Sequence, residues 1–276
     1  AGQLPRVYLR GAASNQTLVV IDGIPQNDAT TGGGYDLSDL GTAAVERGEV
    51  LRGSYGVLYG SEAIGGVIDV TTRRGAGPAQ GFLRVEGGSF DTLREAAGAY
   101  GGDPDWSFAL TGANLRTHGE RARESHRASE ATSRVAYTGV RGLGLTWTGR
   151  LVDSRAESPF DFGFGTVLPE DGNIERARTT LSTGVAAEWS VAPWLDLRAH
   201  ASLLDVDSAF TNGPDGVEVV DPDFVPGSGD EIRVAAPYGR FTFTGEEADS
   251  IVLIGCGVGI TPLMSVIRYL TDRSWP

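Results

Sequence analysis

Residues 15–28 read Asn-Gln-Thr-Leu-Val-Val-Ile-Asp-Gly-Ile-Pro-Gln-Asn-Asp, and this stretch decides how the first part of the chain folds. Its β-branched run, at 17–21, predicts a short strand, and a similar run at 66–70 predicts another. Between the two runs, residues 37–47 are expected to form a short helix. The first zone, residues 1–77, is also rich in glycine, so we predict a small mixed α/β unit with many turns.

The second zone alternates apolar residues with small or charged residues, which is the period of a half-buried strand. In residues 143–151, for example, Leu, Leu, Trp, Gly and Leu alternate with Gly, Thr, Thr and Arg. The segments with this pattern lie near 80–88, 91–101, 105–117, 130–141, 143–155, 177–191 and 194–208. We therefore expect a run of antiparallel strands joined by tight turns and by long polar loops.

Two architectures satisfy this alternation, a soluble β-sandwich and a membrane β-barrel. The segments are longer than the roughly 5–6 residues usual for a sandwich strand. Short turns alternate with long loops, as in outer-membrane barrels, and Trp189 and Trp194 flank the tight turn at 191–193, where an aromatic girdle would sit. The pattern favours the barrel, and the sandwich stays open as the alternative.

The third zone differs in character from the strands before it. Prolines and a Gly-Ser-Gly stretch at 227–229 form a linker-like region. The following elements are expected: strands at 231–235, 241–244 and 251–254, a turn at 237–239, a glycine loop at 255–262 and an amphipathic helix at 263–271. Strand, loop and helix in this order form the first part of a βαβ unit.

Composition argues against several classes of protein. The 276 residues include 36 acidic and 23 basic residues, and the net charge of −13 argues against a nucleic-acid partner. The single cysteine, Cys256, excludes an internal disulfide and a multi-cysteine zinc site. No apolar run reaches 18 residues, which argues against a transmembrane helix but leaves a membrane barrel open. His118 and His126 lack regular ligand spacing, so we predict no metal site.

The ordered motifs at 7–11, 15–28, 44–53 and 58–68 resemble the plug domain of TonB-dependent outer-membrane receptors, especially the cobalamin-receptor branch. The resemblance implies that the alternating segments are the first strands of the barrel around the plug. It also implies an outer-membrane location, TonB as a partner, uptake of a scarce nutrient such as cobalamin or a metal chelate, and neither a cofactor nor catalysis in this part. The family's TonB box and first plug strand are expected to precede Ala1, and we expect no signal peptide in this chain.

Within the plug, one group of residues is expected to maintain shape rather than to touch ligand: Arg10, Asp22, Gly23, Arg47, Arg52, Gly53, Gly60, Gly65 and Gly66. The arginines are expected to pair with Glu46, Glu49 and Asp22, or with carboxylates on the inner face of the barrel. The glycines are expected to permit tight turns and close backbone approaches.

The third zone resembles a different family, the ferredoxin-reductase-like flavoprotein oxidoreductases, in the motifs at 229–232, 237–241 and 257–262. The resemblance implies NAD(P) and FAD as cofactors. The residues expected at the dinucleotide are Gly255, Gly257, Val258, Gly259, Ile260, Thr261 and Pro262, where a helix N-terminus meets a pyrophosphate. The family's flavin-holding Arg-x-Tyr-Ser/Thr element has no counterpart here, so neither cofactor is expected to bind this chain.

The predicted fold class is therefore mixed: a small α/β plug domain, antiparallel strands of an incomplete outer-membrane barrel, and a partial α/β nucleotide-binding segment. The expected boundaries are 1–77 for an N-terminally truncated plug, 78–212 for the partial barrel, 213–228 for a junction and 229–276 for the ferredoxin-reductase-like segment. We expect a chimera whose main part is a receptor fragment. The alternative function is flavin- and nicotinamide-dependent electron transfer by the last segment.

Overall fold

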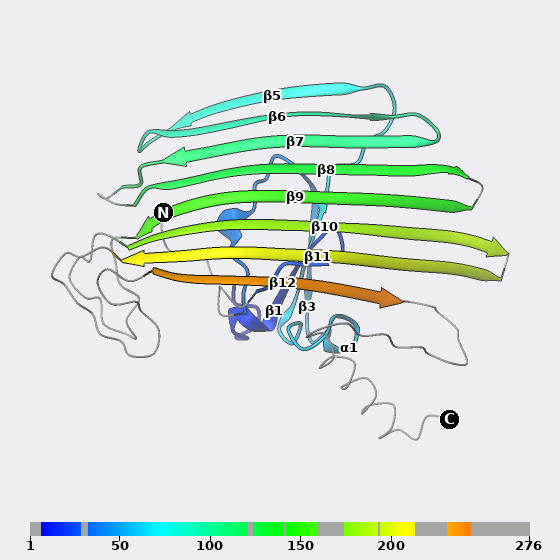
Figure 1. Ribbon diagram of the computed structural model, residues 1–276, viewed down its shortest axis with the longest axis horizontal. Helices are drawn as coiled ribbons and strands as arrows, with labels where there is room; N and C mark the ends of the chain where they lie inside the picture. The colour runs from blue at the N-terminus through cyan, green and yellow to red at the C-terminus, as the bar shows by residue number, and fades with distance from the viewer. Residues whose placement is uncertain are drawn as a thin grey trace, which may run out of the picture.

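The computed structural model describes the residues 7–28, 33–120, 124–140, 142–158, 174–192, 194–212 and 231–243. They form a four-stranded sheet and an eight-stranded sheet. In Figure 1 the long strands of the second sheet lie side by side, and the strands of the first sheet cross them at a steep angle. No helix in these ranges has the length and apolar character needed to cross a membrane.

The smaller sheet is the core of the plug. Its strands are β1 (Thr17–Ile21), β2 (Ile24–Pro25), β3 (Val45–Arg52) and β4 (Gly66–Thr72), in the spatial order β2-β1-β4-β3. β1 runs parallel to β4, and the other neighbours are antiparallel. The short helices are η1 (Ser14–Gln16), η3 (Leu37–Asp39) and α1 (Gly56–Tyr59). The small α/β unit predicted from the sequence is present.

Both faces of this sheet are covered, which explains why every residue of β1 is buried. Because successive strand residues point to opposite faces, the run divides between two apolar clusters. Leu18 and Val20 pack with Ala63 and Val67 on one side. The other cluster consists of Val19, Ile21, Tyr35 and Val70. The continuous apolar run at 17–21 is thus a two-sided core strand.

The prediction of a helix over residues 37–47 is wrong. Helix η3 ends at Asp39, and a strand, β3, starts at Val45. β3 pairs antiparallel with β4 from Val45↔Thr72 onward, and Val45 packs against the apolar cluster around Val70. Pairing with the free edge of β4 outweighs the weak local helix preference of this segment.

The larger sheet is an antiparallel meander of long strands. They are β5 (Gln80–Gly88), β6 (Thr92–Gly102), β7 (Trp106–Thr117), β8 (His126–Val140), β9 (Leu143–Ser158), β10 (Ile174–Ala192), β11 (Leu195–Asn212) and β12 (Glu231–Phe243). Each strand pairs with its neighbour in sequence, so β5 and β12 are the edges. Strand lengths reach 19 residues in β10, far beyond an ordinary sandwich strand of about 5–6 residues.

Alternation along these strands separates two faces. On β9, Val152 is buried with 1% of its surface exposed, whereas its neighbour Leu151 is 47% exposed. On β10, Arg176 and Arg178 are buried against the plug, whereas Leu181 lies on the opposite, exposed face. The sheet therefore turns a polar inner face to the plug and an apolar face outward, as expected for the wall of an outer-membrane barrel.

Strand β12 differs from the prediction. A strand, a turn at 237–239 and a second strand were expected, but β12 is continuous and pairs with β11 from Thr211↔Glu231 to Ala199↔Phe243. Pro237 is tolerated because β12 is an edge strand, whose second side needs no hydrogen-bond donor. The unpaired edge of β11 favours such an addition.

Candidate functional site

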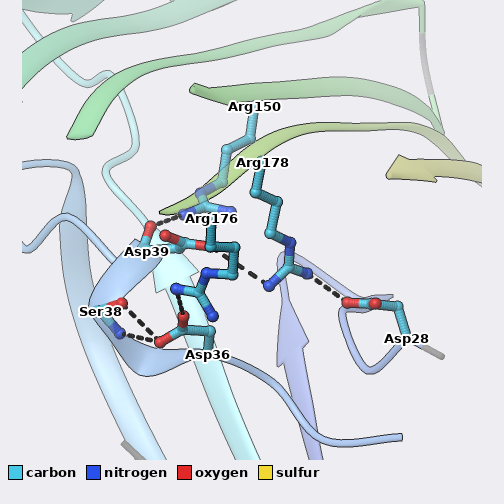
Figure 2. Close-up of polar contacts among 7 residues, drawn as sticks. All are labelled: Asp28, Asp36, Ser38, Asp39, Arg150, Arg176 and Arg178. Carbon is cyan, nitrogen blue, oxygen red and sulfur yellow. Dashed lines mark hydrogen bonds and ion pairs between the residues drawn. The ribbon is translucent and has the colours of Figure 1, made fainter. Parts of the chain in front are cut away.

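The interface between the plug and the inner face of the eight-stranded sheet contains a cluster of ion pairs. Arg134 of β8 and Arg176 and Arg178 of β10 reach plug carboxylates that lie far away in sequence, and Figure 2 shows the two arginines of β10. Arg176 and Arg178 are two residues apart on β10, so both side chains point to the same face. We name the cluster the interface charge cluster; its members are Asp22, Asp28, Asp36, Asp39, Glu130, Arg134, Arg150, Arg176 and Arg178.

Arg178 joins two plug segments. Its Nη2 donates a hydrogen bond to Oδ2 of Asp28, and its Nη1 lies 3.4 Å from Oδ2 of Asp39. All three side chains are almost completely buried. Because a buried charge without a partner is strongly unfavourable, the guanidinium and the two carboxylates stabilise one another only while plug and sheet are together.

Asp36 has two roles at the same interface. Its Oδ1 accepts hydrogen bonds from the Ser38 backbone N–H at 2.9 Å and from Ser38 Oγ at 2.6 Å, which caps helix η3. Its Oδ2 accepts a hydrogen bond from Arg176 Nη2 of β10. The capped helix thereby holds the Asp36 carboxylate in position for the sheet, as Figure 2 shows.

Arg150 of β9 donates from Nη2 to the backbone carbonyl of Asp39 and from Nε to Oε1 of Glu130 at 2.6 Å. The Glu130 carboxylate is pressed against the plug at Gly41. A Cβ atom on Gly41 would lie 1.8 Å from Glu130 Oε2, so a residue with a side chain does not fit there without displacement.

Arg134 and Asp22 form a further connection between sheet and plug. Arg134 Nη1 of β8 donates to Asp22 Oδ1 at 3.0 Å. The Asp22 carboxylate also accepts from the Thr72 backbone N–H at 2.9 Å and from Thr72 Oγ1 at 2.5 Å. Asp22 has a φ of 51°, a left-handed conformation that aspartate tolerates better than most residues. The same carboxylate ties the end of β4 to the turn after β1 and to the sheet.

Burial changes the acid–base properties of two plug residues near these arginines. Removal from water raises the pKa of Tyr35 to about 12, so its hydroxyl stays neutral at any physiological pH. Burial, followed by the like charge of Asp36, raises the pKa of Asp39, and Arg178 partly opposes the increase. Asp39 therefore depends on the neighbouring arginines to carry its charge.

The charge arrangement expected between plug and barrel is reversed. Plug arginines were expected to meet carboxylates of the barrel, whereas arginines of the sheet meet carboxylates of the plug. Arg10 and Arg52 are exposed. Arg47 pairs within the plug with Glu49, one of its expected partners, at 3.4 Å, and both side chains are exposed.

The glycines expected to shape the plug occupy unusual backbone positions. Gly23, Gly53, Gly60 and Gly66 have positive φ. Gly65 has no room for a side chain, because a Cβ there would lie 2.5 Å from Ala12 Cβ. Gly23 lies near His200 of the inner sheet face. A Cβ atom placed on Gly23 would lie 3.9 Å from His200 Nε2.

The two histidines of the sequence analysis have different places in the structure. His118 is exposed and lies 3.4 Å from Asp91. His126 is buried at the start of β8, close enough to Asp36, Asp39 and Arg176 to interact with their charges. The described part of the chain contains no group of three or more potential metal ligands among His, Cys, Asp and Glu. Residues 255–262, expected to hold a dinucleotide, lie outside the described residues.

Sequence reasoning missed most of the interface charge cluster, including Asp28, Asp36 and Asp39. The alternation of apolar and polar residues along the strands contained a signal for the arginines of this cluster. Arg150, Arg176 and Arg178 fall on positions that the pattern assigns to the face opposite the exposed leucines. Arginines at inner positions of consecutive strands need anionic partners, and the plug is the element that can supply them.

A long antiparallel wall that contacts a small plug through its polar inner face is the fold of outer-membrane barrels with an internal plug. Residues 1–67 match the family described as "TonB-dependent Receptor Plug Domain". Over 71 residues the chain is 46% identical to the vitamin B12 transporter BtuB of Vibrio vulnificus (strain YJ016), a match that covers 26% of this chain and 11% of that protein.

Solved structures similar in fold include receptors for siderophores and other iron chelates. The siderophore receptor PirA from Acinetobacter baumannii has a TM-score of 0.62 and 18% identity, covering 86% of this chain and 38% of PirA. The ferric yersiniabactin uptake receptor FyuA from Yersinia pestis has a TM-score of 0.60 and 17% identity, and the match covers 86% of this chain and 38% of FyuA. The chain thus spans well under half the length of either receptor, and these relatives support an outer-membrane location.

Proposed function

We propose that this chain forms the plug and the first wall strands of a TonB-dependent outer-membrane receptor that imports a scarce nutrient, such as a cobalamin or a ferric siderophore. The match of the plug family over residues 1–67 and the receptor fold of the sheet support this assignment. The identity to a vitamin B12 transporter extends over 71 residues, so it favours cobalamin without excluding a metal chelate. TonB would supply the work of import.

The observation that carries the proposal is the interface charge cluster. A plug that must stay in a wet barrel and yet respond to mechanical work needs polar attachment rather than a large apolar interface. Arg178 with Asp28 and Asp39, and Arg176 with Asp36, provide such attachment. The plug residues Arg10, Asp22, Gly23, Arg47, Arg52, Gly53, Gly60, Gly65 and Gly66 are proposed to maintain its shape, within boundaries of 1–77 for the plug and 78–212 for the strands after it.

Uptake measurements test this function. The receptor that contains this chain is expressed in a cell that lacks its own cobalamin and siderophore receptors, and uptake of labelled cobalamin and of labelled iron on a set of siderophores is measured with and without TonB. The proposal predicts uptake of one of these compounds that disappears without TonB. Correct insertion in the outer membrane without any TonB-dependent uptake or binding would contradict it.

A further inference from the structure

The outward face of the eight-stranded sheet carries a row of arginines on three neighbouring strands. Arg116 of β7 is the register partner of Arg127 of β8, and Arg127 is the register partner of Arg155 of β9. All three side chains are exposed, whereas Ser154 and Ala156 on either side of Arg155 are buried toward the plug. Like charges directly opposite one another on a sheet are destabilising, so this arginine row needs negative partners.

The part of the chain that the structure describes does not supply these partners. Within it, none of the three arginines forms an ion pair. Two exposed carboxylates near the row accept hydrogen bonds from other residues. Glu95 accepts from Asn114 Nδ2 at 3.4 Å, and Asp153 accepts from Thr179 Oγ1 at 3.0 Å. The arginine row is therefore available to a group outside the chain.

Carboxylates gather on the same face of the next two strands, which lie beside β9 in the sheet (Figure 1). Glu175 of β10 and Asp205 and Asp207 of β11 are exposed, and the two aspartates flank the buried Val206. We name these three residues the acidic patch. Glu175 is also the register partner of Glu157, a second alignment of like charges. Among the described residues, no member of the acidic patch forms an ion pair.

Both sets of charges lie toward the same end of the strands. Arg116 is one residue before the end of β7, and the connections at this end are the long ones, 118–125, 159–173 and 213–230. Longer loops are extracellular in outer-membrane barrels. The exposed Leu151 of β9 lies nearer to the short-turn end than Arg155 does. The charges therefore lie at or beyond the edge of the apolar band, where water reaches them.

We propose that two copies of the receptor pair side by side in the membrane, with the arginine row of each copy facing the acidic patch of the other. The inference rests on the outer-membrane placement proposed above. A two-fold rotation about an axis parallel to the membrane normal, in front of β9 and β10, turns the same face of both copies toward each other. It brings β7–β9 of one copy opposite β10 and β11 of the other, so the contact is self-complementary.

Small side chains leave room for the arginines of the second copy. The row that contains Arg155 continues with Ala177 of β10 and Ala209 of β11. Glu175 and Asp207 lie two residues from these alanines on the same face of the same strands. A guanidinium that lies over the alanines thus has a carboxylate within reach. Because exposed ion pairs are individually weak and are screened by salt, the pair forms reversibly and weakens as salt rises.

The test uses the whole receptor that contains this chain, in vesicles of phosphatidylcholine, a lipid without net charge. Receptors with donor and with acceptor fluorophores are mixed, and energy transfer reports pairing. Transfer in the wild type should increase with receptor density and fall with salt. Arg127→Glu with Arg155→Glu, or Asp205→Arg with Asp207→Arg, should each raise the density needed for half-maximal transfer about tenfold or more, because like charges then face each other.

A mixture of the two double variants separates pairing from other causes of a loss. Mixed together, they should restore the transfer, because the introduced carboxylates of one protein then face the introduced guanidinium groups of the other. Restoration also requires that both variants are folded. The control is Glu95→Arg, an outward charge reversal on β6 that belongs to neither set, and it should leave the transfer unchanged.

Several outcomes would overturn the pairing. They are no density-dependent transfer in the wild type, equal transfer in the wild type and both double variants, or a mixture that fails to restore it. Transfer that appears only after addition of phosphatidylglycerol would show that the arginine row binds lipid phosphate and would also overturn the pairing. Absence of the receptor from the outer-membrane fraction of the cell would instead contradict the proposed function.

Discussion

Gly41 illustrates how one missing side chain permits the contact between plug and sheet. The Glu130 carboxylate occupies the space where a Cβ of residue 41 would stand, at 1.8 Å. It is held there by Arg150 at 2.6 Å. The identity of residue 41 therefore decides whether Glu130 can remain in the interface charge cluster.

We predict that Gly41→Ala lowers the free energy of unfolding by about 1–3 kcal/mol, the usual cost of forcing extra atoms into a packed site. Urea denaturation of the folded protein in detergent measures the change. Gly48→Ala is the matched control, because a Cβ at Gly48 meets nothing within 4 Å and its φ is not in the left-handed region. Equal effects of the two substitutions would contradict the proposed contact.

Tyr35 gives a prediction at alkaline pH. Its pKa is raised to about 12 in the folded state from 10.0, so the unfolded chain releases this proton first as pH rises. The stability that Tyr35 contributes is complete below pH 10 and is lost between about pH 10 and 12, with a slope of at most about 1.4 kcal/mol per pH unit.

Tyr35→Phe should remove this part of the pH dependence while keeping the ring in the apolar cluster with Val19, Ile21 and Val70. Urea denaturation of both proteins at pH 9, 10 and 11 makes the comparison. Parallel curves for the wild type and the variant would show that the hydroxyl is not buried in the folded protein.

At the scale of elements, the alternating strands were predictable and the ends of several of them were not. Strand β9 was expected to end at 155 and reaches Ser158, and β10 begins at Ile174, before the expected 177. Pairing between neighbours extends both strands, since Ile174 is opposite Ser158. Hydrophobic alternation fades toward loops, whereas backbone pairing continues as long as a partner strand is available.

The helix expected at 37–47 failed for a related reason. Local preference predicted a helix for Val45 and the residues after it, but they pair with the edge of β4 and form β3. The interface charge cluster joins residues more than a hundred positions apart, such as Arg178 and Asp28, so no local pattern could pair them. Sequence reasoning thus identified the plug motifs and the wall and left their attachment undefined.

Strand β12 carries its own prediction. A continuous strand paired with β11 protects the backbone N–H groups that point to β11 on both sides of Pro237. Hydrogen exchange of the folded chain should show slow exchange at alternate amides before and after residue 237. Fast exchange throughout 236–240 would favour the turn that the sequence suggested.

At the scale of the whole molecule, the ferredoxin-reductase-like character of residues 229–276 stays a prediction from the sequence. The glycine loop at 255–262 lies outside the described residues, and the plug family match ends at residue 67. We expect purified protein to show no flavin absorbance and no oxidation of NADH. Either signal, abolished by Gly257→Val and Gly259→Val together, would instead support a working nucleotide site.

The central claim is that buried ion pairs between the sheet arginines and the plug carboxylates hold the plug to the wall. Arg178 and Asp28, both almost fully buried, are the pair that tests it. Removal of one partner leaves the other buried with its closest ion pair lost, at a cost of up to about 3–5 kcal/mol. Arg198→Ala, an arginine exposed on β11, serves as the control and should have little effect.

The most direct measurement is a double-mutant cycle of Arg178→Ala and Asp28→Ala, read from urea denaturation of the membrane-extracted protein. The plug–wall attachment predicts a coupling energy of about 1.5 kcal/mol or more, with the double variant less destabilised than the sum of the single variants. Strictly additive effects, with a coupling energy near zero, would show that Arg178 and Asp28 do not act together and would contradict the attachment of plug to wall by this ion pair.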